Sequence, residues 1–174
     1  MDANTGWVGG NGIEPDGGIW LREDTSGCPV PITHCTAKLN SCSQIPAIGH
    51  SGFPSASATS GFTISATGAR ANRSGLLLYT NSGAANPALP FQGGLLCLNT
   101  APLRRGPAVS SGGVAGCDGT ITLDMNAFAS GNAGGNPASF LSVPGTKIDC
   151  QWWGRDTVLH GAFLSDGIGY TVCP

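Results

Sequence analysis

The sequence has few charged side chains and no long apolar run. Asp, Glu, Lys and Arg make up only 10% of its 174 residues, against about 25% in an average soluble protein. The longest apolar cluster, at residues 76–79, is far shorter than the roughly 20 residues that span a bilayer. We therefore expect no membrane span. The low charge reflects 28 glycines and 12 prolines, which are typical of turns.

Positive charge is equally scarce and is not clustered. Eight Lys and Arg residues stand against ten Asp and Glu residues, which gives a net charge of −2. The only adjacent basic pair is Arg104-Arg105. A nucleic-acid-binding protein needs clustered cations to displace counterions from the phosphates, so this composition excludes nucleic acid as a partner.

Helical periodicity is nearly absent, because Gly or Pro interrupts almost every stretch of a dozen residues. Short segments alternate large apolar with small polar residues instead, as half-buried strands do. Residues 62–67 and 119–124 show this most clearly, and turn residues stand at 81–83, 92–94 and 111–113. Further strands are expected at residues 76–80, 95–99, 147–153 and 168–173, with a single helical turn at 126–130. This pattern predicts an all-β fold, a β-sandwich or jelly roll.

The first 27 residues differ from the rest of the chain. Six glycines at residues 6–18 surround two apolar islands, one formed by Trp7 and Val8 and the other by Ile19, Trp20 and Leu21. We interpret residues 1–27 as a Gly-rich N-terminal arm that carries strand-forming pieces, and residues 28–174 as the domain. The alternative is that the arm holds an ordinary first strand of its own domain.

Seven cysteines in a chain with Gly-rich loops indicate an oxidising, extracellular compartment. A cytosolic zinc protein is the alternative, but zinc sites favour closely spaced pairs, and only His34-Cys35 resembles one. The odd number leaves one thiol unmatched. Export is inferred from the cysteines, because residues 1–4 lack the start of a signal peptide; we expect a mature form or a piece of a longer precursor.

No catalytic constellation is recognisable, so we expect a protein that is not an enzyme. The segment at residues 49–53 resembles a nucleophile elbow only superficially, because its fifth residue is Phe53 rather than Gly. Paired carboxylates for glycoside cleavage would have to be Asp residues, since both Glu residues lie in the arm.

A bound cofactor is not expected either. Calcium is the one ion considered, through the oxygens of Asp118, Asp124 and Asn126. No spaced calcium loop is present, and we favour hydrogen bonds that fix turns for these side chains.

Two adjacent tryptophans, Trp152 and Trp153, are candidates for contact with a partner. Neighbouring residues in a strand point to opposite faces, so at most one of them faces the core. The other contacts a partner, stacks on a sugar or packs at a sheet edge. Asn72 begins an Asn-Arg-Ser sequon and is a possible glycosylation site.

From about residue 35 onward, the chain contains a series of short motifs that together form a recognisable pattern. They are CTAK at 35–38, NSC at 40–42, PAIG at 46–49, GLLLY at 75–79, PFQGG at 90–94, LC at 96–97, RR at 104–105, DMN at 124–126, QWWGRD at 151–156 and CP at 173–174. With these motifs the chain resembles a family of β-rich domains of secreted proteins from environmental bacteria, often C-terminal modules of unassigned function. The resemblance implies an extracellular β domain and no specific activity.

The resemblance also implies a set of disulfides. It pairs Cys35 with Cys42, Cys97 with Cys117 and Cys150 with Cys173, and it leaves Cys28 over at the junction of arm and domain. Each bridge would add about 2–4 kcal/mol of stability.

Two functional hypotheses follow. The first is a self-assembling subunit of an extracellular fibre, in which the arm of one copy pairs head to tail with a sheet of the next. The second is a carbohydrate-binding or adhesive module that uses the tryptophan pair. The partners expected are therefore copies of the chain itself under the first hypothesis and glycans under the second.

Overall fold

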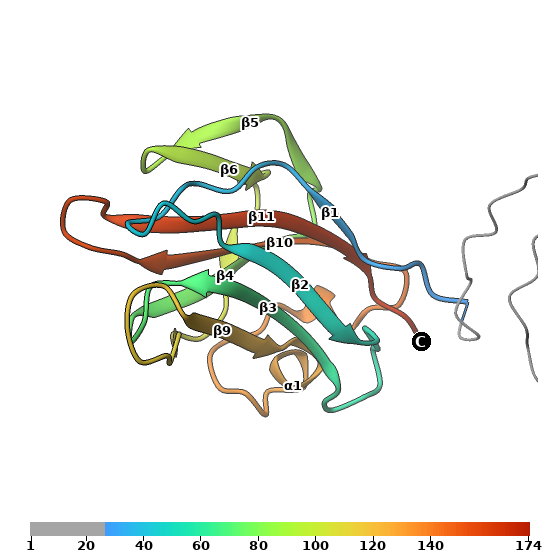
Figure 1. Ribbon diagram of the computed structural model, residues 1–174. Coiled ribbons are helices and arrows are strands. Elements are labelled where there is room, and N and C mark those ends of the chain that lie inside the picture. Colours follow the sequence, from blue (N-terminus) through green and yellow to red (C-terminus); the bar gives the residue numbers. More distant parts are fainter. Residues whose placement is uncertain (1–26) are drawn as a thin grey trace, which may run out of the picture.

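The computed structural model describes residues 27–174 (Figure 1). The residues predicted to carry the assembly arm lie outside the described part of the chain; they are Trp7, Val8, Ile19, Trp20 and Leu21. The arm hypothesis therefore stays a prediction. The regular structure of the described chain is mostly strands, with only two short helical segments, which confirms the all-β fold class.

Three antiparallel sheets make up the described chain. The largest runs in the order β1 (Ile32–His34), β11 (Ala162–Thr171), β10 (Lys147–Arg155), β4 (Ser74–Thr80) and β7 (Arg104–Arg105), and β8 (Val109–Ser110) also pairs with β4. The second contains β2 (Ala47–Gly52), β3 (Phe62–Ala69) and β9 (Gly119–Asp124), and the third is the hairpin of β5 (Ala84–Phe91) and β6 (Gly94–Leu98). Two short helices, α1 (Met125–Ala129) and a 3-10 turn (Ser139–Ser142), follow β9.

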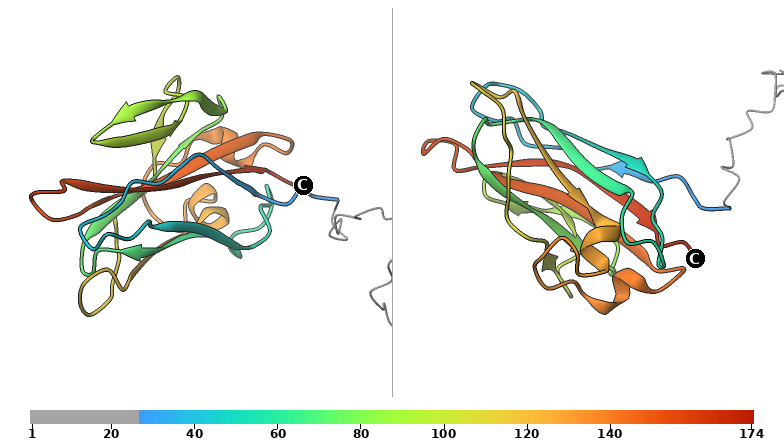
Figure 2. Two further views of the ribbon diagram at one scale, coloured as in Figure 1. Left: turned by 45° about the horizontal axis from the view of Figure 1, so that its top comes forward. Right: turned by 90° about the horizontal axis from the view of Figure 1, so that it is seen from below.

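The main core lies between the six-stranded and the three-stranded sheets, which therefore form a β-sandwich (Figures 1 and 2). Alternate residues of each strand face it, because the side-chain period of a strand is two. In β3 and β9 the alternation predicted for residues 62–67 and 119–124 is confirmed by the burial of every second side chain. Edge-to-face ring contacts, such as that between Phe62 and Tyr170 with centroids 4.9 Å apart, fill the core. The jelly-roll topology stays a prediction.

A second apolar layer covers the other face of the six-stranded sheet. There Leu78 of β4 packs with Leu96 and Leu98 of the β5–β6 hairpin, and Trp153 packs against the same cluster. Strand β5 contains Pro87 and Pro90, which cannot donate to a ladder, and it pairs only with β6, as an edge strand containing proline must.

The adjacent tryptophans of β10 point to opposite faces. Trp152 is fully buried in the main core, and its indole Nε1 has no partner among the described residues. Trp152 is therefore ruled out as a partner-contact candidate, because its register in β10 turns the ring toward the three-stranded sheet. The expectation that at most one of the two rings faces the core is confirmed. Trp153 is the half-exposed member of the pair.

The disulfides pair differently from the expected set. Cys28 pairs with Cys173, Cys35 with Cys97 and Cys42 with Cys117, while Cys150 is a buried free thiol. Five of the six expected cysteines thus form disulfides, but every expected pairing is wrong. The bridges join segments 62 to 145 residues apart in the sequence rather than neighbours in the chain.

The strand register explains the error for Cys150. It lies opposite Ile168 of β11 and faces the core, so Cys173 lies five residues farther along, about 17 Å at 3.4 Å per residue. A disulfide requires Cα atoms within about 7 Å. Cys28 reaches that position instead, with its Cα atom 6.1 Å from that of Cys173. Burial raises the pKa of the Cys150 thiol well above its usual value, which leaves it unreactive.

No helix in residues 27–174 has the length and apolar character needed to cross a bilayer.

Candidate functional site

Trp153 lies in an open depression where β10 ends and its loop to β11 begins. The depression has a volume of about 470 Å³ and is lined by Trp153, Arg73, Gln92, Arg155, Thr157 and Val158 among others. Arg73 precedes β4, and Gln92 lies in the β5–β6 turn. Segments that are far apart in the sequence therefore build this surface.

The indole ring is held in place from two directions. Trp153 packs against the second apolar cluster, and its Nε1 donates to Oε1 of Gln92 at 2.8 Å. Lys38 Nζ donates to the backbone oxygens of Gln92, His160 and Ala162, each at 2.9 Å. Lys38 thus ties the β5–β6 turn to the β10–β11 loop on either side of the ring.

Asp156 stabilises the β10–β11 loop where that loop lines the depression. Its carboxylate accepts hydrogen bonds from the backbone N and Oγ of Ser41 and from the backbone N of Thr157, and the residue is only 6% exposed. Burial by itself raises the pKa of Asp156, but these hydrogen bonds and the nearby His160 outweigh it and hold the pKa below its usual value. Asp156 therefore serves to hold the loop by hydrogen bonds.

The two arginines of the depression carry unneutralised charge. Both side chains are exposed, and in residues 27–174 the one ion pair found joins His34 to Asp149 instead. The backbone N of Arg73 donates to Oγ of Ser111 at 3.0 Å, which anchors the turn that carries its guanidinium. Arg155 is the last residue of β10. The depression thus presents two free cations beside an aromatic ring.

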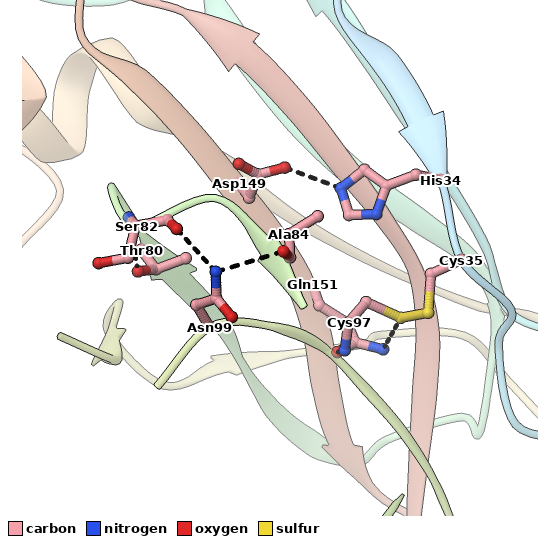
Figure 3. A network of polar contacts seen from close by, with 9 residues as sticks. All are labelled: His34, Cys35, Thr80, Ser82, Ala84, Cys97, Asn99, Asp149 and Gln151. Atoms are coloured by element: carbon pink, nitrogen blue, oxygen red, sulfur yellow. Dashed lines mark hydrogen bonds and ion pairs between the residues drawn. A yellow bond between two sulfur atoms is a disulfide. The ribbon is translucent and has the colours of Figure 1, made fainter. Parts of the chain in front are cut away.

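A second polar cluster lies on the same outer face of the sheet (Figure 3). Nε2 of His34 lies 2.9 Å from Oδ1 of Asp149. A Cβ atom at Gly167 would collide with the His34 ring, and one at Gly169 would crowd the Asp149 carboxylate. These two glycines of β11 therefore make room for the pair above the strand.

Gln151 is a fully buried polar residue of this face. Its Nε2 donates to the backbone oxygens of Leu95 at 3.0 Å and Ser165 at 2.8 Å, and its Oε1 accepts from the backbone N of Cys97 at 3.0 Å. Nε2 also lies 3.2 Å from Sγ of Cys97, which is bonded to Cys35 (Figure 3). Gln151 and the disulfide together join β10 to the hairpin that covers it.

A shallow groove of about 350 Å³ crosses the outer face at the open edge of the six-stranded sheet, beside the ion pair. Pro29, Val30 and Ile32 are among its apolar lining residues. Val30 is 56% exposed and Ile32 is 71% exposed. The arm predicted at residues 1–27 leads directly into this segment of the chain.

The remaining candidates from the sequence lie apart from these surfaces. Asp118 and Asp124 stand at opposite ends of β9, so the structure does not bring them together as calcium ligands. Asp118 accepts from the backbone N of Val114 and Ala115, and Asp124 caps α1 through the N of Ala127. The side-chain amide of Asn126 accepts a hydrogen bond from the backbone N of Ser55 and donates to the backbone oxygens of Phe53 and Ser60. These contacts confirm the turn-fixing role.

Two further sequence candidates lie on exposed backbone. Asn72 lies in the exposed β3–β4 turn with φ of 53°, a position accessible to modification, and glycosylation there stays a prediction. His50 and Ser51 are neighbours in the edge strand β2, where their side chains point to opposite faces.

In the described part of the chain, no group of three or more His, Cys, Asp or Glu side chains is placed to hold a metal ion.

Sequence reasoning missed the partners of Trp153. Arg73, Gln92 and Lys38 come from three distant loops, and the motifs and the sequon that contain them gave no sign that they meet. Arg155 lies inside the motif at 151–156 but carried no local signal of its role.

No protein-family model, curated protein or solved structure matches the chain. The resemblance to secreted bacterial β domains therefore stays a prediction, and the functional argument rests on the geometry alone.

Proposed function

We propose that this chain is an extracellular structural protein, a subunit that joins copies of itself head to tail through the N-terminal arm of residues 1–27. Three disulfides suit an oxidising compartment. They lock a domain with few charged side chains, which is the kind of rigid unit that a surface fibre repeats.

The open edge at β1 is the observation that carries this proposal. In the described chain β1 pairs only with β11, and β2 pairs only with β3, so both strands leave one row of backbone groups without a strand partner. Strand β2 lies against β11, which brings the two edges to the same side of the sandwich (Figure 1). Unpaired edges invite strand addition.

The root of the arm is fixed beside this edge. Cys28 is buried and bonded to Cys173, close to the C-terminal end of β11. The exposed side chains of Val30 and Ile32 border the groove directly after it. An apolar piece such as Ile19-Trp20-Leu21 would cover these side chains, and Trp20 is the anchor that we assign to the groove of the next copy.

The arm of the same copy is the competing occupant. Residues 22–27 span at most about 20 Å when extended, which is enough to fold back onto the groove. Docking within one copy gives a monomer, whereas docking between copies does not close and gives filaments.

Titration of a peptide of residues 2–27 into a chain that lacks them tests the groove contact. We expect one peptide to bind per domain and Trp20→Ala in the peptide to abolish the heat of binding. Ile32→Arg in the domain should do the same, because it places a charge in the apolar groove. Val114→Arg is the matched control, since Val114 is 88% exposed in another loop and should leave binding unchanged. Absence of binding by the unaltered peptide would contradict the proposal.

A second candidate is a carbohydrate-binding or adhesive module, favoured by the half-exposed Trp153 ring in its depression. Aromatic rings held rigidly at a surface suit stacking on the apolar face of a sugar. Screening against a broad glycan array should then give signals that Trp153→Ala removes while the thermal unfolding transition persists. An array without signals would count against this candidate.

A further inference from the structure

We propose that the depression around Trp153 binds an anionic saccharide, a short run of pyranose rings that carry carboxylate or sulfate groups. This inference rests on the second candidate function and names its ligand class.

The ring provides a preformed stacking surface. Trp153 is fixed by the apolar cluster beneath it and by the hydrogen bond to Gln92, and Gln92 is itself held by Lys38. A ring that is already immobile loses little conformational entropy when a ligand stacks on it. The depression is open and shallow, which suits an extended chain of sugars better than a small enclosed molecule.

The charges beside the ring have one sign. Arg73 and Arg155 are exposed and have no carboxylate within 4 Å in the described chain. The one carboxylate that lines the depression, Asp156, is buried and accepts three hydrogen bonds from Ser41 and Thr157, which already satisfy its charge. The surface therefore attracts anions although the whole chain has a net charge of −2.

The register places the two cations at the same end of two neighbouring strands. Gly154 of β10 pairs with Gly75 of β4. Arg155 directly follows Gly154, and Arg73 lies two residues before Gly75. Guanidinium groups bind carboxylate or sulfate oxygens through paired N–H donors. A sugar chain stacked on Trp153 would reach both guanidinium groups by extending toward that end of the strands.

The charged groups exposed to a ligand in the depression are the two guanidinium groups, which only donate, beside the hydroxyl of Thr157 and the hydrogen-bonded carboxylate of Asp156. Oε1 of Gln92 accepts from Trp153, which leaves its Nε2 to donate alongside the two guanidinium groups. The hydroxyls of a neutral sugar both donate and accept, whereas a carboxylate or sulfate only accepts and carries the opposite charge to a guanidinium. The two guanidinium groups thus favour the anionic class.

Titration of the whole chain with defined oligosaccharides tests this assignment. The probes are oligogalacturonate, its methyl ester, which lacks the charge, and sulfated dextran against unmodified dextran. We expect binding of both anionic probes, at least about tenfold weaker binding of both neutral ones, and an affinity that falls as salt rises.

Two double variants of equal charge locate the site. Arg73→Gln/Arg155→Gln should weaken binding of the anionic probes by about tenfold or more, because charge-assisted hydrogen bonds are lost. Arg104→Gln/Arg105→Gln is the matched control, since these two arginines line a separate depression with Tyr79, and it should bind as the unaltered chain does. Trp153→Phe, which keeps a ring, should retain more affinity than Trp153→Ala.

Each outcome bears on one of two claims. Equal binding of charged and neutral probes at Trp153 would overturn the anionic assignment and leave carbohydrate binding standing. Binding of none of the probes would overturn both. Equal weakening by the two double variants, or binding of single-stranded DNA as tight as that of the saccharides, would show a nonspecific charge effect and would overturn the site.

Discussion

The two faces of the six-stranded sheet are built from the same strands but are stabilised in different ways. On the inner face, alternate residues such as Leu77, Ile148 and Trp152 are apolar and fully buried. On the outer face, their neighbours Thr80, Asp149 and Gln151 take part in hydrogen bonds, with a disulfide and a small apolar cluster beside them.

This difference separates stability from function. The inner face is a closed core, in which side-chain volume decides what fits. The outer face holds its shape through specific polar contacts and leaves Trp153, two arginines and the groove beside β1 open. Both surfaces to which we assign partners lie on this side of the sheet.

The largest effect is expected from comparing the adjacent tryptophans. Trp152→Ala should lower the free energy of unfolding by about 4–5 kcal/mol, because it empties a fully buried site. Trp153→Ala removes a half-exposed ring and should lower it by about 2 kcal/mol. Urea denaturation of both variants measures the difference, and an equal or reversed order would contradict the assignment of the faces.

The next effect concerns the disulfide of the outer face. Cys35→Ala/Cys97→Ala should lower the free energy of unfolding by about 3–4 kcal/mol, because the bridge closes a loop across 62 residues. Chemical denaturation checks this value. Cys150→Ala is the control, since it keeps all three bridges and removes only one buried thiol. A larger loss for Cys150→Ala than for the double variant would show that the bridge is dispensable.

Gln151 tests whether buried polar contacts stabilise the outer face. Gln151→Leu should lower the free energy of unfolding by about 2–3 kcal/mol, because it leaves the N of Cys97 and the oxygens of Leu95 and Ser165 without partners. The exposed Gln44→Leu should change stability by about 0.5 kcal/mol or less. If Gln151→Leu is neutral or stabilising, packing rather than hydrogen bonding fixes the hairpin.

The smallest effect is the pH dependence from Asp156. Its pKa is lower in the folded chain than in the unfolded chain, so its stabilisation is complete above the unfolded value of about 3.9 and disappears as pH falls through the folded value. In the Asp156→Asn variant, the free energy of unfolding should therefore fall less steeply as the pH drops below about 4. Thermal unfolding between pH 2 and 7 measures this. Asp118→Asn should change the profile less, because Asp118 is exposed, and equal profiles for Asp156→Asn and the unaltered chain would contradict the role of Asp156.

The sequence predicted the strands of the core well because burial on one face leaves a period of two. The predicted strands at residues 62–67 and 119–124 match β3 and β9 closely. Strand β5 was missed, because Pro87 and Pro90 argue against a strand unless it lies at an edge. Edge strand β1 has only three residues, too few to show alternation.

The disulfides and the site of Trp153 depend on which loops meet in space. The predicted pairing of Cys150 with Cys173 is wrong because the register of β10 and β11 places the two residues far apart. That register cannot be inferred from the spacing of the cysteines in the sequence. Lys38, Arg73 and Gln92 gather around Trp153 only after three sheets have packed. Local patterns therefore predict the elements, whereas long-range register decides the site.

The most direct test of the account is the native mass of the whole chain by light scattering across a tenfold range of concentration. We predict a mass that rises with concentration above the 17.5 kDa of one copy, and a single-copy mass for the chain that lacks residues 2–27. A whole chain that stays monomeric throughout, or a truncated chain that still polymerises, would contradict assembly through the arm.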